Sequence, residues 1–213
     1  MKLTNKNKLK VEVEFTNEVL GTLSGTSEIT KEFIASKHPD GVQQDEIEAL
    51  GVDEEVSKKS TVFPRDKDGN IVIYDYQIKG MIKGACYAMI HSGNFTDAKL
   101  KKYRLTNYLY KKTIDTQIFV KPRQIIVQLP EGVDANKLPF CERPLRAETM
   151  RGERIALARS ETIPAGSKIS FEIVTFNQDL MPLIKEWLDS GEYLGFLQWR
   201  SSGKGSFIWK ELK

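Results

Sequence analysis

The sequence predicts an α+β fold with the element order strand, helix, strand, strand, helix, strand. Apolar residues alternate with charged ones from Leu9 to Phe15, which is the period of a strand with one buried face. Apolar residues recur at the spacing of an amphipathic helix from Ile78 to Ile90, and again from Leu180 to Leu188. Strand-like runs separated by turn residues lie between and after these helices.

The first strand is expected over Lys8–Phe15, where one face carries Leu, Val and Phe and the other carries Lys and Glu. An acidic and weakly periodic region follows from 27 to 60. Short helices are expected within it over Glu28–Ala35 and Gln43–Leu50. We therefore expect this region to be an insertion that projects from the core.

Two further strand pairs are expected before and after the first helix. The residues Asp66–Asn70 form a turn between the apolar runs 61–63 and 71–74, which predicts a β-hairpin. After the helix, the runs Ile114–Val120 and Gln124–Leu129 are expected to be strands, with a Lys-Pro-Arg turn between them.

The first helix is expected to extend to His91. Lys79 and Lys83 lie one turn apart off its apolar stripe, and Gly80 and Gly84 follow them directly. Glycine within a helix costs about 1 kcal/mol relative to alanine, so two at this spacing indicate close approach of another backbone or of a ligand. Packing onto a sheet and contact with phosphate explain the spacing equally well.

The last third of the chain is expected to hold the rest of the core. The runs 155–158 and 169–173 are expected to form a strand pair around the turn Pro164–Gly166. After the second helix, strands are expected over Tyr193–Trp199 and Phe207–Leu212.

Assembled without insertions, these elements give the βαββαβ order of a ferredoxin-like sheet, with two helices on one face. We expect one domain over residues 1–213 with insertions at about 27–76 and 93–150. The core elements are expected over 8–15, 78–91, 153–159 with 168–174, 180–189, and 205–212.

The composition is that of a soluble globular protein: 40% of the residues are hydrophobic and 29% are charged. No run approaches the roughly 18 apolar residues of a membrane span, and no apolar segment follows the basic start, so a cytoplasmic protein is expected. Cys86 and Cys141 are far apart, and His38 and His91 are the only histidines. Their spacing assembles no conventional zinc site, so we expect free thiols, no metal and no cofactor.

The net charge of +3 conceals a separation of charge. Residues 40–57 hold seven acidic residues and no Lys or Arg, whereas residues 99–123 hold eight basic residues against Asp115 alone, with tyrosines between them. A solvated helix face explains the basic segment as readily as a polyanion site does. The candidate RNA contacts from this segment are Lys111, Lys112, Lys121 and Arg123.

Five arginines fall within the 17 positions from Arg143 to Arg159, against Glu148 and Glu153. Because guanidinium binds phosphate bidentately and stacks on bases, this run favours nucleic-acid contact. Pairing between Arg and Glu within the protein is the alternative. The candidates from this run are Arg146, Arg151 and Arg154.

The segment Gly195–Trp209 places Arg200, two serines, Lys204 and two glycines between aromatic-rich runs. Such a loop can bring backbone N–H groups, cations and aromatic faces together at a phosphodiester chain.

Three segments carry a resemblance to a known family. They are the first strand running into Leu20–Gly25, the strand-to-helix junction Gln77–Gly84, and the closing loop Gly195–Phe207. On these motifs the chain resembles the RAMP superfamily, the RRM-like RNA-binding proteins of CRISPR effector complexes, and most closely their backbone subunit that coats guide RNA. The resemblance covers about half of the chain.

The resemblance implies a CRISPR-associated, antiviral-defence protein that binds guide-like or single-stranded RNA and associates with itself or with other effector subunits. A stand-alone relative on a mobile element would show the same residues. In that family a similar helix start and a late glycine-rich loop touch the RNA backbone. The resemblance therefore implies this role for Lys79, Gly80, Lys83, Arg200, Ser201, Gly203 and Lys204.

Two other functions remain open at this point. One is a metal-independent, guide-processing RNA endonuclease, for which His38 is the available acid–base residue and no dyad partner is evident. The other is a protein-only inhibitor or mimic of a CRISPR effector complex, with the acidic segment 40–57 imitating phosphate charge. Non-catalytic RNA binding is the leading expectation.

Overall fold

The computed structural model describes residues 7–24, 60–93, 95–149 and 152–213. The helices expected over 28–35 and 43–50, the acidic segment 40–57 and His38 lie outside these residues.

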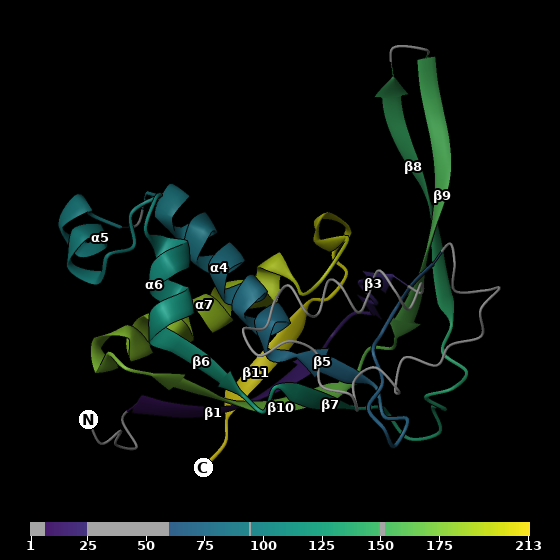
Figure 1. Ribbon diagram of the computed structural model, residues 1–213, viewed down its shortest axis with the longest axis horizontal. Coiled ribbons are helices and arrows are strands. Elements are labelled where there is room, and N and C mark those ends of the chain that lie inside the picture. The colour runs from purple at the N-terminus through teal and green to yellow at the C-terminus, as the bar shows by residue number, and fades with distance from the viewer. Residues whose placement is uncertain (1–6, 25–59, 94, 150–151) are drawn as a thin grey trace.

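The main sheet is antiparallel throughout, with the strand order β11-β1-β10-β7-β5 and with β6 beside β10 (Figure 1). The two central strands, β1 and β10, therefore have a neighbouring strand on both sides over most of their length. Its strands are β1 (Lys8–Phe15), β5 (Val72–Tyr74), β6 (Ile118–Lys121), β7 (Gln124–Gln128), β10 (Lys168–Thr175) and β11 (Phe207–Glu211).

Two long helices, α4 (Asp75–His91) and α7 (Met181–Leu194), pack against each other on one face of this sheet. Two shorter ones, α5 (Asp97–Tyr103) and α6 (Tyr110–Gln117), lie between α4 and β6 in the chain, and α6 packs on α4. The core order β1-α4-β6-β10-α7-β11, with the spatial order β11-β1-β10-β6, is that of a ferredoxin-like fold. The expected fold class is confirmed.

The second core strand is not the one expected from the sequence. The expected partner of β10, residues 153–159, lies in β9 (Gly152–Ile163), which pairs with β8 (Phe140–Thr149) instead. The turn at 164–166 does not close a hairpin, because Gly166 N–H donates to the carbonyl oxygen of Phe15 (2.7 Å) and the chain crosses there into the main sheet. The strand expected from Ile114 begins as helix α6, which leaves β6 only four residues long.

A second sheet has the order β2-β9-β4-β3, with β8 paired to β9 (Figure 1). Strands β8 and β9 form a long hairpin that projects far from the rest of the protein. The hairpin expected between 61–63 and 71–74 is limited to its turn, because β4 and β5 join different sheets. Across the turn, Arg65 pairs with Ile71, and Asp66 N–H and Val72 N–H donate to the carbonyl oxygens of Asn70 and Pro64. The short strands are β2 (Val19–Leu20), β3 (Leu23–Ser24) and β4 (Ser60–Val62).

The apolar face of β1 meets both long helices in one core. Val11 and Phe15 are almost fully buried, as are Ile82 of α4 and Trp187 of α7. Burial of each such side chain contributes about 1.5–3 kcal/mol. Gly191 permits this packing, because a Cβ there would lie 2.8 Å from the Phe207 ring.

The opposite face of the main sheet carries charged side chains in pairs. Glu12 binds Lys210 at 2.7 Å and Glu14 binds Lys168 at 3.0 Å. The hydrogen bond from Lys210 lowers the pKa of Glu12, and the hydrogen bond to Glu14 raises the pKa of Lys168. The charges of these two pairs therefore compensate each other on this face.

None of the helices in the described part of the chain has the length and apolar composition of a membrane span.

The two cysteines are free thiols in different surroundings: Cys86 is on the buried face of α4, whereas Cys141 of β8 is half-buried. Burial raises the pKa of the Cys86 thiol to about 12, so it stays protonated and unreactive near neutral pH.

We expect Ellman's reagent at pH 8 to modify Cys141 in the native protein and Cys86 only in denaturant. Rapid modification of two thiols under native conditions would contradict this packing of α4.

Candidate nucleic-acid interface

The chain between α7 and β11 is a closed loop, not the strand expected over Tyr193–Trp199. Helix α7 runs to Leu194, and a short 3₁₀ turn follows at Arg200–Ser202. Gly195 and Gly205, with φ of 72° and 75°, bring the two ends of the loop together. A Cβ on Gly205 would lie 2.2 Å from the carbonyl oxygen of Phe196, so no other residue fits this crossing.

Two side chains of this loop fix it to the body of the protein. Phe196 is buried and its ring stacks on that of Phe15, with centroids 5.8 Å apart. The Gln198 amide nitrogen donates to the carbonyl oxygen of Gly21 and, at 3.0 Å each, to the hydroxyls of Thr61 and Ser160. The loop is thereby tied to both sheets.

Gln198 also connects the loop to the base of the projecting hairpin. Its amide oxygen accepts a hydrogen bond of 3.0 Å from Arg143 of β8, and the Arg143 guanidinium lies 4.9 Å from the centre of the Trp199 ring. Stacking of this kind holds a cation beside an aromatic face while the charge stays available. Arg143 and Trp199 were not among the predicted contacts, although both lie in segments that the sequence marks as basic or aromatic.

The loop and α4 enclose an open groove, which we call the loop groove. Its volume is about 740 Å³, and it is lined by Gly84, Tyr87, Ala88, Tyr193, Leu194, Trp199, Arg200 and Ser201. Gly84 faces the Arg200 guanidinium, since a Cβ on Gly84 would lie 3.2 Å from the Arg200 Nη1 atom. Two tyrosines border the groove with exposed rings: Tyr87 is 50% and Tyr193 is 88% exposed.

The two glycines that the sequence singled out on α4 have different surroundings. Gly84 faces Arg200, whereas Gly80 is exposed, with no atom within 4 Å of the position of a Cβ. Neither glycine packs against the sheet. Gly84 therefore leaves the helix backbone bare beside Arg200 of the loop, and Gly80 leaves it bare one turn earlier.

The lysines beside these glycines point elsewhere. Lys83 forms an ion pair with Asp115 of α6 at 2.6 Å. Lys79 lies over the Phe119 ring at 5.1 Å, and burial is the main cause that lowers its pKa. Both side chains therefore extend toward α6 and β6 rather than into the loop groove.

Lys204 and Gly203 complete the loop without lining the groove. The Lys204 Nζ atom lies 2.5 Å from the Glu18 carboxylate, and Gly203 closes the 3₁₀ turn with a φ of 79°. The structure thus brings Arg200, Ser201 and α4 together and places Lys204 on the outer side of the loop.

The basic candidates from 99–123 lie in two other places. Lys111 lies over the Tyr110 ring at 5.8 Å, and Lys112 lines a separate cavity beside α5. Lys121 and Arg123 border a shallow groove with Lys10. Arg146 and Arg154 are placed in β8 and β9 by their backbone alone, and Arg151 lies outside the described residues.

Substitution of Gln198 tests the attachment of the loop. In Gln198→Leu, the Arg143 guanidinium and two hydroxyls lose a partner, so we expect a loss of about 1–3 kcal/mol in the free energy of unfolding. Urea denaturation measures it. The matched control is Gln128→Leu, at an exposed glutamine of β7, and equal stability of the two variants would contradict the anchoring role.

No family model and no curated relative matches this chain. Among solved structures, it is similar to a chain of a Type IV-B CRISPR complex, with 9% identity, a TM-score of 0.47, and coverage of 96% of this chain and 90% of that one. It is also similar to a chain of the Type III-B Cmr-beta complex bound to cognate target RNA, with 12% identity, a TM-score of 0.46, and coverage of 98% and 61%. These structural neighbours are thus chains of CRISPR effector complexes.

Proposed function

We propose that this protein is an RNA-binding subunit of a RAMP-type ribonucleoprotein assembly and that it holds the RNA backbone, without sequence preference, in the loop groove. The observation that carries the proposal is the position of Arg200 against the bare backbone of Gly84, between two exposed tyrosines. The resemblance of the sequence to the RAMP superfamily supports the same assignment.

The electrostatics of the described residues favour Arg200 and Arg143 as phosphate contacts. Neither guanidinium has a carboxylate partner in the described part of the chain, whereas Lys83 and Lys204 each have one. A cation already paired must give up its carboxylate to bind phosphate, which offsets much of the gain. In this proposal Arg200 and Arg143 therefore make the main contacts, and Lys79, Lys83 and Lys204 contribute less.

The shape of the groove suits a single strand rather than a duplex. Gly84 lets a sugar–phosphate chain approach the helix closely, and Ser201 offers a hydroxyl beside it. Tyr87, Tyr193 and Trp199 offer ring faces on which any base can stack. Such contacts bind the backbone and stack bases without reading their edges, so little sequence preference is expected.

The other basic candidates extend this surface. We propose further contacts with the RNA backbone at Lys111, Lys112, Lys121 and Arg123. The arginines that the sequence marks at Arg146, Arg151 and Arg154 are proposed as a third set of contacts. In this proposal the subunit works beside further copies of itself or beside other subunits of an effector complex, so that one RNA passes from subunit to subunit.

Two substitutions in the loop groove test the proposal by fluorescence anisotropy with a labelled 20-nucleotide RNA. Arg200→Ala is expected to weaken binding about 10-fold, and to reduce the slope of log K against log salt by about 0.7, because one phosphate contact is lost. Gly84→Glu is expected to weaken binding at least as much, because its carboxylate would pair with Arg200 and repel phosphate.

The controls separate loss of contact from loss of structure or of charge. Gly84→Ala adds only a methyl group beside the flexible end of Arg200, so near-native affinity is expected. Lys67→Ala removes one positive charge from the exposed turn between β4 and β5, at a residue that does not line the groove. RNA affinity that is unchanged in Arg200→Ala, or lowered equally in Lys67→Ala, would rule out the loop groove as the RNA site.

A further inference from the structure

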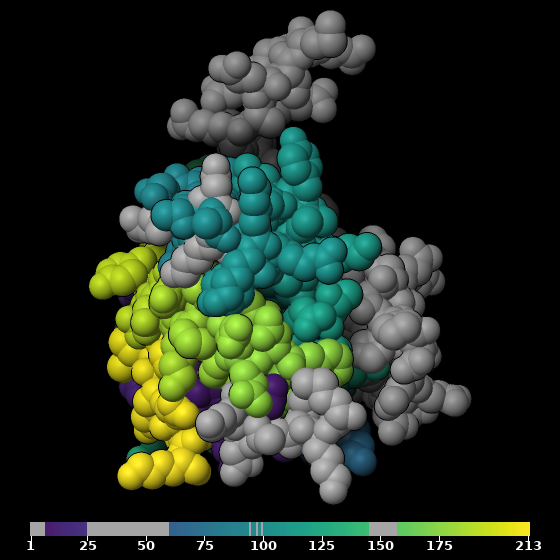
Figure 2. Space-filling model, turned by 90° about the vertical axis from the view of Figure 1, so that its left-hand side faces the viewer, coloured from purple at the N-terminus to yellow at the C-terminus, as the bar shows by residue number. Residues whose placement is uncertain are grey.

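A second cavity lies where α5, α6 and the turn before α7 meet, on the face shown in Figure 2, where blue-green residues of α5 and α6 lie above the yellow-green residues of α7. We call it the α5–α6 pocket. It shares no residue with the loop groove. Its volume is about 380 Å³, and it is lined by Lys102, Tyr103, Arg104, Leu109, Lys112, Thr113, Thr116, Gln117, Asn177 and Leu180.

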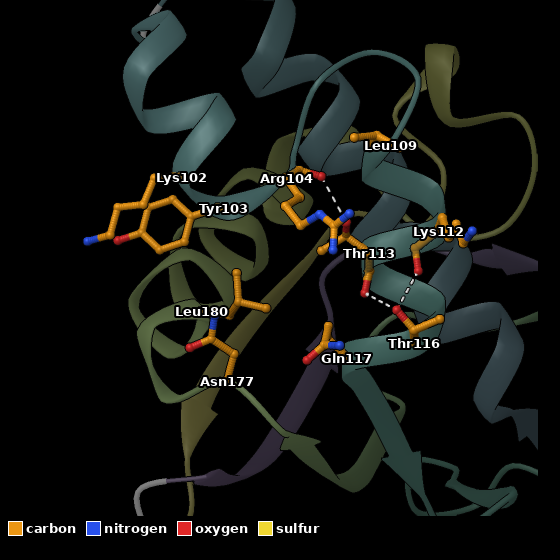
Figure 3. Close-up of a pocket in the computed structure, with 10 residues that line it drawn as sticks. All are labelled: Lys102, Tyr103, Arg104, Leu109, Lys112, Thr113, Thr116, Gln117, Asn177 and Leu180. Carbon is orange, nitrogen blue, oxygen red and sulfur yellow. Dashed lines mark hydrogen bonds between the residues drawn. The ribbon is translucent and has the colours of Figure 1, made fainter.

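The lining divides into an apolar side and a polar side (Figure 3). The Tyr103 ring and the Leu180 side chain form one side, and the Arg104 side chain extends between Tyr103 and Thr113. The side chains of Gln117 and Asn177 lie below Arg104 in this view. The Tyr103 ring, with the Lys102 Nζ atom 5.0 Å from its centre, and the Leu180 side chain are thus combined with a guanidinium and two amides around one small space.

The charge of the pocket is uncompensated. Three of the lining residues are cationic and none carries a carboxylate. Asp115, the acidic residue of α6, pairs with Lys83 instead. By contrast, Arg65 is paired with Glu161 at 2.5 Å. The pocket therefore has the electrostatics of an anion site.

The polar groups of the pocket have spare hydrogen-bonding capacity. Within the described residues, the Arg104 guanidinium and the Gln117 side-chain amide make neither a hydrogen bond nor an ion pair. The side-chain amide oxygen (Oδ1) of Asn177 accepts from Asp179 N–H at 3.1 Å, which leaves the side-chain N–H₂ as a donor. The Thr113 hydroxyl donates to the Arg104 carbonyl oxygen at 2.8 Å and can still accept.

We propose that the α5–α6 pocket binds one nucleoside 5′-monophosphate unit. Arg104 binds the phosphate bidentately, as a planar guanidinium does. The base packs on Tyr103 and Leu180, and its edge bonds to the amides of Gln117 and Asn177. Lys102 and Lys112 add positive potential from the rim. A cavity of about 380 Å³ is at the small end of ligand sites, which suits one nucleotide rather than an oligomer.

Two ligands can supply a nucleoside 5′-monophosphate unit: a free nucleotide, or the 5′-phosphorylated terminal nucleotide of an RNA. A terminal phosphate carries about −1.5 to −2 charge near neutral pH, whereas an internal phosphodiester carries a single charge, so a pocket with three cations favours the terminal nucleotide. The site is separate from the loop groove, so the proposal does not depend on RNA binding there.

Arg104, the central residue of the pocket, can be replaced without straining the backbone. Arg104 has a φ of 56°, in the left-handed region that favours glycine, at the end of α5. Arg104→Gly therefore removes the guanidinium while it suits the local backbone, and it should fold. Lys101→Ala removes one charge from an exposed neighbour that does not line the pocket, and it serves as the matched control.

Isothermal titration calorimetry of the full chain with AMP, UMP, adenosine and inorganic phosphate tests the free-nucleotide source. We expect the two monophosphates to bind at least about 10-fold more tightly than adenosine or phosphate, since both halves of the pocket are then used. Arg104→Gly should weaken AMP binding at least about 10-fold, and Lys101→Ala and Arg200→Ala should leave it unchanged.

The second arm compares a 20-nucleotide RNA with a 5′-phosphate and the same RNA with a 5′-hydroxyl. If the terminal nucleotide is the ligand, the phosphorylated RNA binds more tightly, AMP competes away the difference, and Arg104→Gly abolishes it. The proposal is overturned if native protein neither binds AMP nor distinguishes the two RNAs, or if Arg104→Gly behaves as native in both arms. Loss of RNA affinity in Arg200→Ala with AMP binding retained would separate this site from the loop groove.

Discussion

The side-chain amide of Gln198 holds the glycine-rich loop to the second sheet, and the loop continues from there into β11 of the main sheet. It bonds to the chain after β2, to β4, to β9 and to the hairpin arginine Arg143. A buried amide left without partners costs about 1–3 kcal/mol, so these bonds hold one arrangement of the loop. The positions of Trp199 and Arg200 relative to α4 and to the hairpin follow from it.

Placement of the carboxylates decides which cations are available to a ligand. Lys83 and Lys204 belong to the motifs that most suggest phosphate binding, yet each is within 2.6 Å of a carboxylate. Arg104 and Arg200 have no such partner in the described residues, and each borders a hollow. In both hollows an arginine is combined with tyrosine rings, which suits the phosphate and the base of a nucleotide together.

The fold class could be predicted because the longest elements carry complete periodic patterns. β1 and α4 bury one face over their whole length, so alternation and helical spacing reveal them. The second core strand escaped prediction because β6 has only four residues and follows directly on α6. Strand β9 has the stronger pattern, yet it pairs with β8, because the backbone of Phe15 takes up the turn residues that would have closed a hairpin with β10.

The sequence by itself determined the periodic core and the residue types of the loop, since both depend on short-range spacing. Only the tertiary structure decided which of the marked residues face a shared space. Glu18, the partner of Lys204, is 186 positions away in the chain, and Arg143 reaches Gln198 across 55. Ion pairs and side-chain hydrogen bonds depend on distance in space, and the order of residues along the chain carries no record of it.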